Sequence, residues 1–78
     1  MDKLLIGWQH GVDQAAVNRL GALITDMRPG DEVTITLEKA EDEEMWPILQ
    51  VLGENGFRVK EQGEKAGKSF IQAQRMYH

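Results

Sequence analysis

The stretch from Met27 to Gln62, MRPGDEVTITLEKAEDEEMWPILQVLGENGFRVKEQ, contains the patterns that decide the fold. In order, it predicts a helix end, a tight turn, a strand, an acidic loop, a second helix and a further strand. Its clearest element is the strand, in which Val33, Ile35 and Leu37 alternate with polar residues. This alternation and the β-branched content indicate a strand with one face on the core.

Proline and glycine residues predict where the helices on either side of this strand begin and end. Pro29-Gly30 ends the preceding helix, because proline cannot continue it and glycine supplies the turn. The second helix is predicted from Met45 to Gly53, with Pro47 in its first turn, where a missing N–H costs nothing. Asn55 or Gly56 then takes the left-handed conformation that ends the helix.

The rest of the chain adds one helix and three strands. A short apolar run, Lys3 to Trp8, predicts a buried strand. A 3.6-residue apolar period from Asp13 to Met27 predicts a helix, with Asp13 as its N-cap. Phe57 to Lys60 predicts a third strand, and Gln62 to Gly67 a polar hairpin loop. Lys68 to Met76 predicts the fourth strand, whose poor alternation indicates partial exposure on both faces.

The predicted order is therefore β-α-β-α-β-β in a single domain, residues 1–78. Strands separated by helices are expected to pair in parallel, and the last two form a hairpin. Two short helices can cover only one face of a four-stranded mixed sheet. We expect an α/β (α+β) two-layer sandwich whose other sheet face is open to solvent or to a partner.

Composition limits the classes of function. The 78 residues include no cysteine, so disulfides, thiolate nucleophiles and cysteine metal sites do not arise. No apolar run reaches the roughly 18–20 residues of a membrane span, and the first residues do not resemble a signal peptide. A cytoplasmic protein is expected. The net charge of −4 disfavours general binding to nucleic acid phosphates.

Several of these features together resemble the TusA (SirA-like) family of small sulfur-carrier proteins, which has the same β-α-β-α-β-β order. The resemblance covers roughly Met27 to Arg75. It rests on the turn, the strand after it, the acidic loop, the apolar–proline step, the end of the second helix and the closing strand: Pro29-Gly30, Val33 to Leu37, Glu41 to Glu44, Trp46-Pro47, Gly53 to Phe57 and Phe70-Ile71.

The family's sulfur chemistry depends on a Cys-Pro-x-Pro motif at the start of the first helix, where the helix end activates the thiol. Counted back from Pro29-Gly30, that cysteine would fall near Asp13. Counted from the glycine of the first strand, it would fall near His10. Neither position holds a cysteine. The resemblance therefore implies a TusA-like domain without sulfur-carrier activity. We expect no enzyme activity and no cofactor.

Candidate contact residues lie where the family's active residue would be. His10 is a potential base or ligand, and a metal or small-ligand site near it is one alternative, although no metal-ligand cluster is readable. Trp8 and Trp46 could share one rim as aromatic anchors for a partner, although tryptophan is more often part of a core. Asp13, near which the family's cysteine would fall, is a further candidate contact residue.

Charge is segregated along the chain. The acidic run Glu41 to Glu44 could bind a divalent cation, but a solvated loop that caps the helix is the simpler interpretation. Five basic residues follow on the hairpin strands and their loop: Arg58, Lys60, Lys65, Lys68 and Arg75. Alternate positions among them could project from one sheet face and meet an acidic partner or RNA. A related fold in a translation initiation factor does bind RNA, which is an analogy only.

The leading prediction is a non-catalytic protein-interaction module in sulfur trafficking or its regulation. The predicted contact residues are Trp8, His10, Asp13, Trp46, Arg58, Lys60 and Lys68. The partner is expected to be another protein, with no membrane association. The chain is expected to be a monomer or a weak homodimer through an edge strand, and the last strand is the candidate edge.

Overall fold

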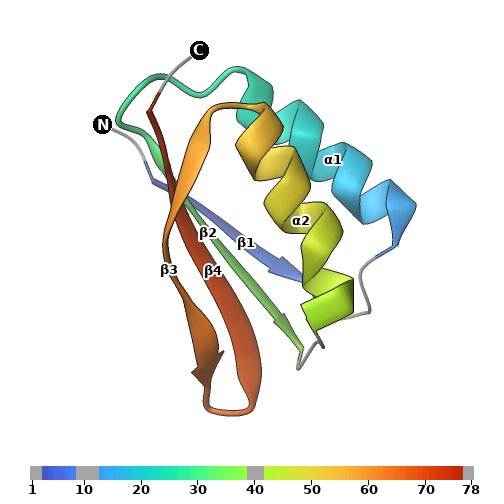
Figure 1. Cartoon of the computed structure of the whole chain (residues 1–78). Coiled ribbons are helices and arrows are strands. Elements are labelled where there is room, and N and C mark those ends of the chain that lie inside the picture. The colour runs from blue at the N-terminus through green and yellow to red at the C-terminus, as the bar shows by residue number, and fades with distance from the viewer. Residues whose placement is uncertain (1–2, 9–12, 39–41, 77–78) are drawn as a thin grey trace.

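The computed structural model describes residues 3–8, 13–38 and 42–76 (Figure 1). They form four strands and two helices in the predicted order. The elements are β1 (Lys3–Trp8), α1 (Gln14–Thr25), β2 (Glu32–Glu38), α2 (Asp42–Glu54), β3 (Phe57–Lys65) and β4 (Lys68–Arg75). The fold class is confirmed: one mixed sheet carries both helices on one side, and its other side has no helix on it (Figure 1).

The strand order is β1-β2-β4-β3, with β1 and β2 parallel and β4 antiparallel to both neighbours. The expected parallel pairing across α1 is confirmed. The expected direct pairing of β2 with β3 is wrong, because β4 lies between them. The last strand is therefore neither a sheet edge nor exposed on both faces. Its apolar residues pair with those of β2, Ile71 beside Ile35 and Ala73 beside Val33, which places β4 in the centre of the sheet.

The core lies between the sheet and the helices. Its fully buried members include Leu20 and Ile24 of α1, Ile35 of β2 and Ile48 and Leu52 of α2. Leu20 and Ile24 are four positions apart, a spacing that places both on one face of the helix. Asp13 is confirmed as the N-cap of α1, since its Oδ1 accepts a hydrogen bond from the Ala16 amide at 2.7 Å.

The turn from α1 into β2 has the geometry that its sequence predicts. Gly30 has a φ of 93°, and the Asp31 amide donates to the Arg28 carbonyl at 2.9 Å. Proline followed by a glycine of positive φ is typical of a type II turn. Asp31 is buried, and its Oδ2 accepts the Arg28 amide at 2.8 Å. The hydrogen bond to this buried carboxylate therefore stabilises the turn.

Arg75 joins this turn to the end of α1. It is only 7% exposed, and its Nη1 donates to the carbonyls of Ile24, Thr25 and Met27 at 2.9, 2.9 and 2.7 Å. The last carbonyls of a helix lack partners within the helix and carry partial negative charge. Arg75 therefore caps α1 from β4. Its guanidinium carbon also lies 5.8 Å from the centre of the Phe57 ring.

Helix α2 begins earlier than predicted. It begins at Asp42, so Glu43 and Glu44 belong to the helix and Pro47 lies in the second turn. Acidic side chains stabilise the positive end of a helix, which favours this earlier start. The end of α2 is as predicted: Gly56 has a φ of 77°.

The hairpin differs from its prediction. β3 continues to Lys65, and the turn consists of Ala66 and Gly67, with φ of 55° and 78°. Two central residues of positive φ characterise a type I′ turn, whose twist matches paired strands. The segment from Gln62 to Lys65 lacks apolar alternation because most of this part of β3 is exposed, so the sequence pattern resembled a loop.

The turn leads to a stability prediction. Alanine in the left-handed region carries a cost of roughly 1 kcal/mol, whereas asparagine tolerates it. Ala66→Asn is therefore expected to raise the free energy of unfolding by about 0.5–1 kcal/mol, measured by urea denaturation. The control Ala66→Val, whose branched side chain is less compatible with positive φ, should lower it. A destabilised asparagine variant would contradict this assignment of the turn.

Candidate interaction surface

The sheet face opposite the helices consists mainly of polar side chains, with a few apolar ones among them. On β2 and β4, the residues that alternate with the buried ones point to this open face. They are Glu32, Thr34, Thr36 and Glu38 from β2 and Lys68, Phe70, Gln72 and Gln74 from β4. Most are partly buried, although neither of the two described helices covers them. We refer to this surface as the open face.

The end of the open face near the hairpin turn is hollowed. An open depression of about 460 Å³ lies there. It is lined by Thr34, Thr36, Glu61, Lys65, Ala66, Lys68 and Phe70. These residues come from β2, both strands of the hairpin and its turn. Such a volume falls in the range of ligand-sized sites, where a few polar groups accompany apolar surface.

Phe70 is the aromatic residue among those that line this depression. It is paired with Gly63 of β3, and a Cβ built at position 63 would lie 3.5 Å from its Cε1 atom. The ring therefore leans over the glycine backbone. An aromatic ring placed across a strand glycine stabilises the pair of strands, and here the ring also lines the depression.

The charges around the depression are unbalanced. Lys65 and Lys68 are exposed and occupy directly opposed positions beside the turn. Like charges at opposed positions are mildly destabilising. Among the described residues, no carboxylate lies within ion-pair distance of either ammonium. Glu61 is the one acidic residue that lines the depression, so its rim has a net positive charge.

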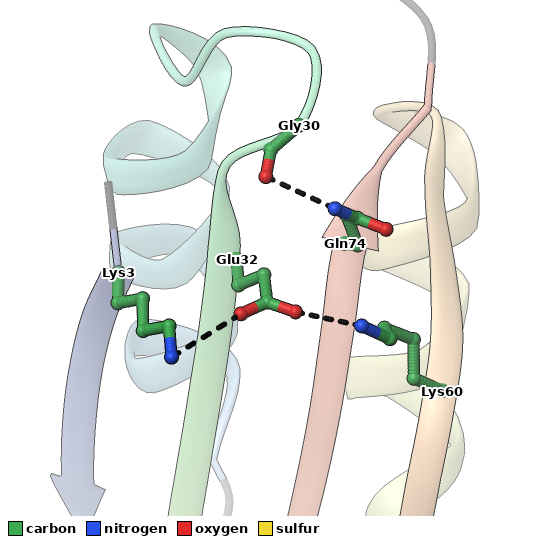
Figure 2. Close-up of polar contacts among 5 residues, drawn as sticks. All are labelled: Lys3, Gly30, Glu32, Lys60 and Gln74. Atoms are coloured by element: carbon green, nitrogen blue, oxygen red, sulfur yellow. Dashed lines mark hydrogen bonds and ion pairs between the residues drawn. The ribbon is translucent and has the colours of Figure 1, made fainter. Parts of the chain in front are cut away.

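At the other end of the open face, the carboxylate of Glu32 forms ion pairs with two lysines of other strands (Figure 2). The Oε1 of Glu32 accepts a hydrogen bond from Lys60 Nζ at 2.8 Å, and its Oε2 lies 3.8 Å from Lys3 Nζ. Lys60 comes from β3 and reaches across β4. It can do so because the ladder is irregular between Val59 and Glu61, where β3 bulges.

This pairing changes the acidity of Glu32. The hydrogen bond from Lys60, with the attraction of both lysines, holds the pKa of Glu32 below its ordinary value, although partial desolvation opposes the shift. A carboxylate with a lowered pKa stabilises the folded state above the pKa of the unfolded chain. That stabilisation is lost as the pH falls through the folded-state pKa.

Replacing Lys60 by methionine should therefore raise the pKa of Glu32 toward its ordinary value and reduce the acid dependence of stability. NMR titration of the Glu32 carboxyl carbon measures the shift directly. Arg58→Met, which removes a neighbouring positive charge on the same strand, serves as the control and should leave the Glu32 titration nearly unchanged. An equal shift in both variants would contradict the specific pairing.

The predicted aromatic residues lie at one end of the molecule but differ in exposure. Trp8 ends β1 beside Leu37, and α2 begins shortly after β2 ends, so Trp8 and Trp46 share this end (Figure 1). Trp8 packs against the core, whereas Trp46 is 65% exposed on α2. Asp13 is engaged as the N-cap of α1. His10, with the proposed ligand site around it, lies outside the described residues.

The predicted basic residues separate into two groups. Arg58, Lys60 and Lys68 lie on the open face, but only Arg58 and Lys68 have no ion-pair partner among the described residues. Arg75 points to the opposite side and is buried, so it does not project with these residues. The reason is the two-residue strand period: Arg75 shares its face with Ile71 and Ala73.

Sequence reasoning did not assign the other lining residues to a site: Thr34, Thr36, Glu61, Ala66 and Phe70. The signal was present for the threonines, since they alternate with the buried residues of β2, and Phe70 was noted only as a ring that could stack on bases. To place the last three beside the threonines requires the position of the bulge, the extent of β3 and the strand order.

The described residues contain no group of three His, Asp or Glu side chains arranged to hold a metal ion. The acidic run Glu41 to Glu44 lies partly outside the described residues, and Glu43 and Glu44 belong to α2. Among the described helices, none has the length and apolar character needed to cross a membrane.

Comparison with protein families, with curated proteins and with solved structures found no match for this chain.

Proposed function

We propose that this chain is a TusA-like protein-interaction module that acts without sulfur chemistry of its own, in sulfur trafficking or its regulation. The resemblance in the sequence motivates the sulfur context, and the β-α-β-α-β-β order is consistent with it. The absence of cysteine from the sequence removes the persulfide chemistry of the carrier proteins. What remains for such a domain is binding.

The observation that carries the proposal is the depression on the open face. It combines an aromatic ring, two threonines and two lysines without ion-pair partners among the described residues. Apolar surface with polar groups at its edge is typical of recognition sites. The contact that we propose therefore lies around Phe70, Lys65 and Lys68.

The charges of this surface define the chemistry of the partner. Lys65 and Lys68 face each other without a carboxylate partner among the described residues. An acidic segment of a partner protein would relieve their repulsion and gain attraction, which mainly increases the rate and specificity of association. The threonine hydroxyls at positions 34 and 36 can donate to or accept from such a segment.

The test is affinity capture from the host's own lysate, with and without RNase, at low and high salt. We expect capture of a defined protein that survives RNase and is reduced at least about tenfold by Lys68→Glu. The matched control is Arg28→Glu, the same charge reversal at an exposed residue of the α1–β2 turn. Equal capture by both variants would exclude the depression as the contact.

Enrichment of sulfur-relay proteins would support the sulfur context. If the captured protein has no link to sulfur metabolism, only the interaction module is left of the proposal.

A second candidate is a small RNA-binding domain. Arg58, Lys65 and Lys68 on the open face, together with Phe70 as a stacking platform, favour it. The net charge of −4 and the burial of Arg75 weaken it. Recovery of RNA that disappears at high salt would support this candidate against the first.

A further inference from the structure

The two edges of the sheet differ in their protection. β3 carries a bulge and several charged residues, which discourage pairing with another strand. β1 pairs with β2 in an unbroken register, and Lys3 is its only charged residue. In the part of the chain that the structure describes, no strand pairs with its outer side, where the edge presents backbone donors and acceptors. β1 is therefore the edge that can accept another strand.

Apolar side chains at this edge are incompletely covered on both sides of the sheet. Leu5 is 78% exposed and belongs to the open face. Leu4, Ile6 and Trp8 pack against the core but remain only partly buried. A further strand beside β1 would cover these residues, and burial of apolar surface is the main driving force of association.

The helix layer has an exposed apolar residue on the same side of the molecule. A Cβ built at Gly21 would lie 3.8 Å from Val51 Cγ1, so position 21 faces α2. Leu23, two residues later, lies about 160° away around the helix, given 3.6 residues per turn. It is 51% exposed. Because α2 packs against β3, the side of α1 away from α2 is the β1 side (Figure 1).

Two residues of opposite charge flank Leu23 on the side of α1 that faces away from α2. Arg19 and Asp26 lie four residues before and three residues after it, which places all three on one side of the helix. Both charged residues are exposed, and neither has an ion-pair partner among the described residues. Asp26 lies at the C-terminal end of α1, where a negative charge is unfavourable for the helix itself.

We propose that a second copy of this chain docks on this edge, with its β1 antiparallel to β1 around a two-fold axis at Leu5. This register sets Leu5 opposite Leu5 of the second copy and Leu4 opposite Ile6, so that core-facing residues stay on one side. Lys3 falls opposite Gly7, which avoids a lysine–lysine contact. The two α1 helices then run side by side, with Arg19 of each near Asp26 of the other.

Sedimentation equilibrium of the full chain from about 10 µM to 1 mM tests the proposal. We expect a reversible monomer–dimer equilibrium, weakened at least about tenfold by Arg19→Asp and by Asp26→Arg. The double variant with both changes exchanges the charges and should return the affinity to within about threefold of the original, because the attraction is restored. Both positions are exposed, so circular dichroism and urea denaturation can verify that each variant folds.

A third variant addresses the strand contact. Leu5→Lys should abolish the dimer because it opposes two positive charges at the axis, whereas Trp46→Lys, which introduces the same charge at an exposed apolar residue of α2, should leave it intact. A mass of one chain throughout the concentration range would overturn the proposal. A dimer that is insensitive to Leu5→Lys or is not restored in the double variant would overturn it as well.

Discussion

Replacing Arg75 by alanine is expected to lower the free energy of unfolding by about 3–5 kcal/mol, because several buried or partly buried carbonyls would each lose a hydrogen bond to a charged group. The carbonyls of Ile24 and Thr25 at the end of α1, and of Met27 just after it, would lose the Nη1 hydrogen bonds that they accept at 2.7–2.9 Å. Arg75 as a whole residue is only 7% exposed, so water would replace its guanidinium poorly as a partner of these carbonyls. The Phe57 ring would also lose its cation.

Urea denaturation at neutral pH measures this loss, and Arg58→Ala provides the matched control. Arg58 lies on the same hairpin but is exposed on the open face, so its replacement should change stability by no more than about 0.5 kcal/mol. If Arg75→Ala does not fold, Arg75→Lys keeps the prediction testable. Lysine keeps the charge but lacks the planar guanidinium, so an intermediate loss is expected. Equal stabilities of the Arg75 and Arg58 alanine variants would contradict the capping role.

Replacing Ile35 by alanine is expected to cost about 2–5 kcal/mol. Ile35 is fully buried at the centre of β2, and its register partners are Ile6 on β1 and Ile71 on β4. Removal of its outer carbons leaves a cavity that neighbours on paired strands can fill only by moving the backbone. The loss therefore includes both the transfer free energy and the cavity term.

Thermal or urea unfolding measures this change, with Thr36→Ala as the control on the next residue of the same strand. Thr36 points to the open face, so its loss should cost less than about 1 kcal/mol. Ile35→Val, which removes one methyl group, should cost about 0.5–1.5 kcal/mol. A Thr36 variant that is as unstable as the Ile35 variant would mean that the two faces of β2 have been assigned the wrong way round.

The sequence predicted the parts of the fold whose patterns are local. The alternation of Val33, Ile35 and Leu37 and the Pro29-Gly30 turn identified β2 and its entry. The strand order could not be predicted from local patterns in the sequence. It depends on β4, whose Ser69 and Arg75 occupy core-facing positions and interrupt the apolar alternation. A buried arginine that caps a distant helix cannot be distinguished in sequence from a surface arginine.

The open face followed from counting elements, since two helices cannot cover both sides of four strands. The depression on this face and the exposure of its side chains could not be predicted from the sequence. The depression depends on the extension of β3 to Lys65 and on the pairing of Phe70 with Gly63, both set by tertiary contacts. The exposure of Leu5 was hidden because its neighbours Leu4 and Ile6 do pack against the core. A continuous apolar run does not reveal which of its members face solvent.

The most direct test of the open face as a protein-binding surface is an NMR titration of the ¹⁵N-labelled chain with the protein captured from the lysate. We expect amide shift changes that concentrate at Thr34, Thr36, Phe70 and the hairpin turn. The amides of α2 on the opposite layer should change little. Shift changes confined to the helices, with the open face unaffected, would contradict the account.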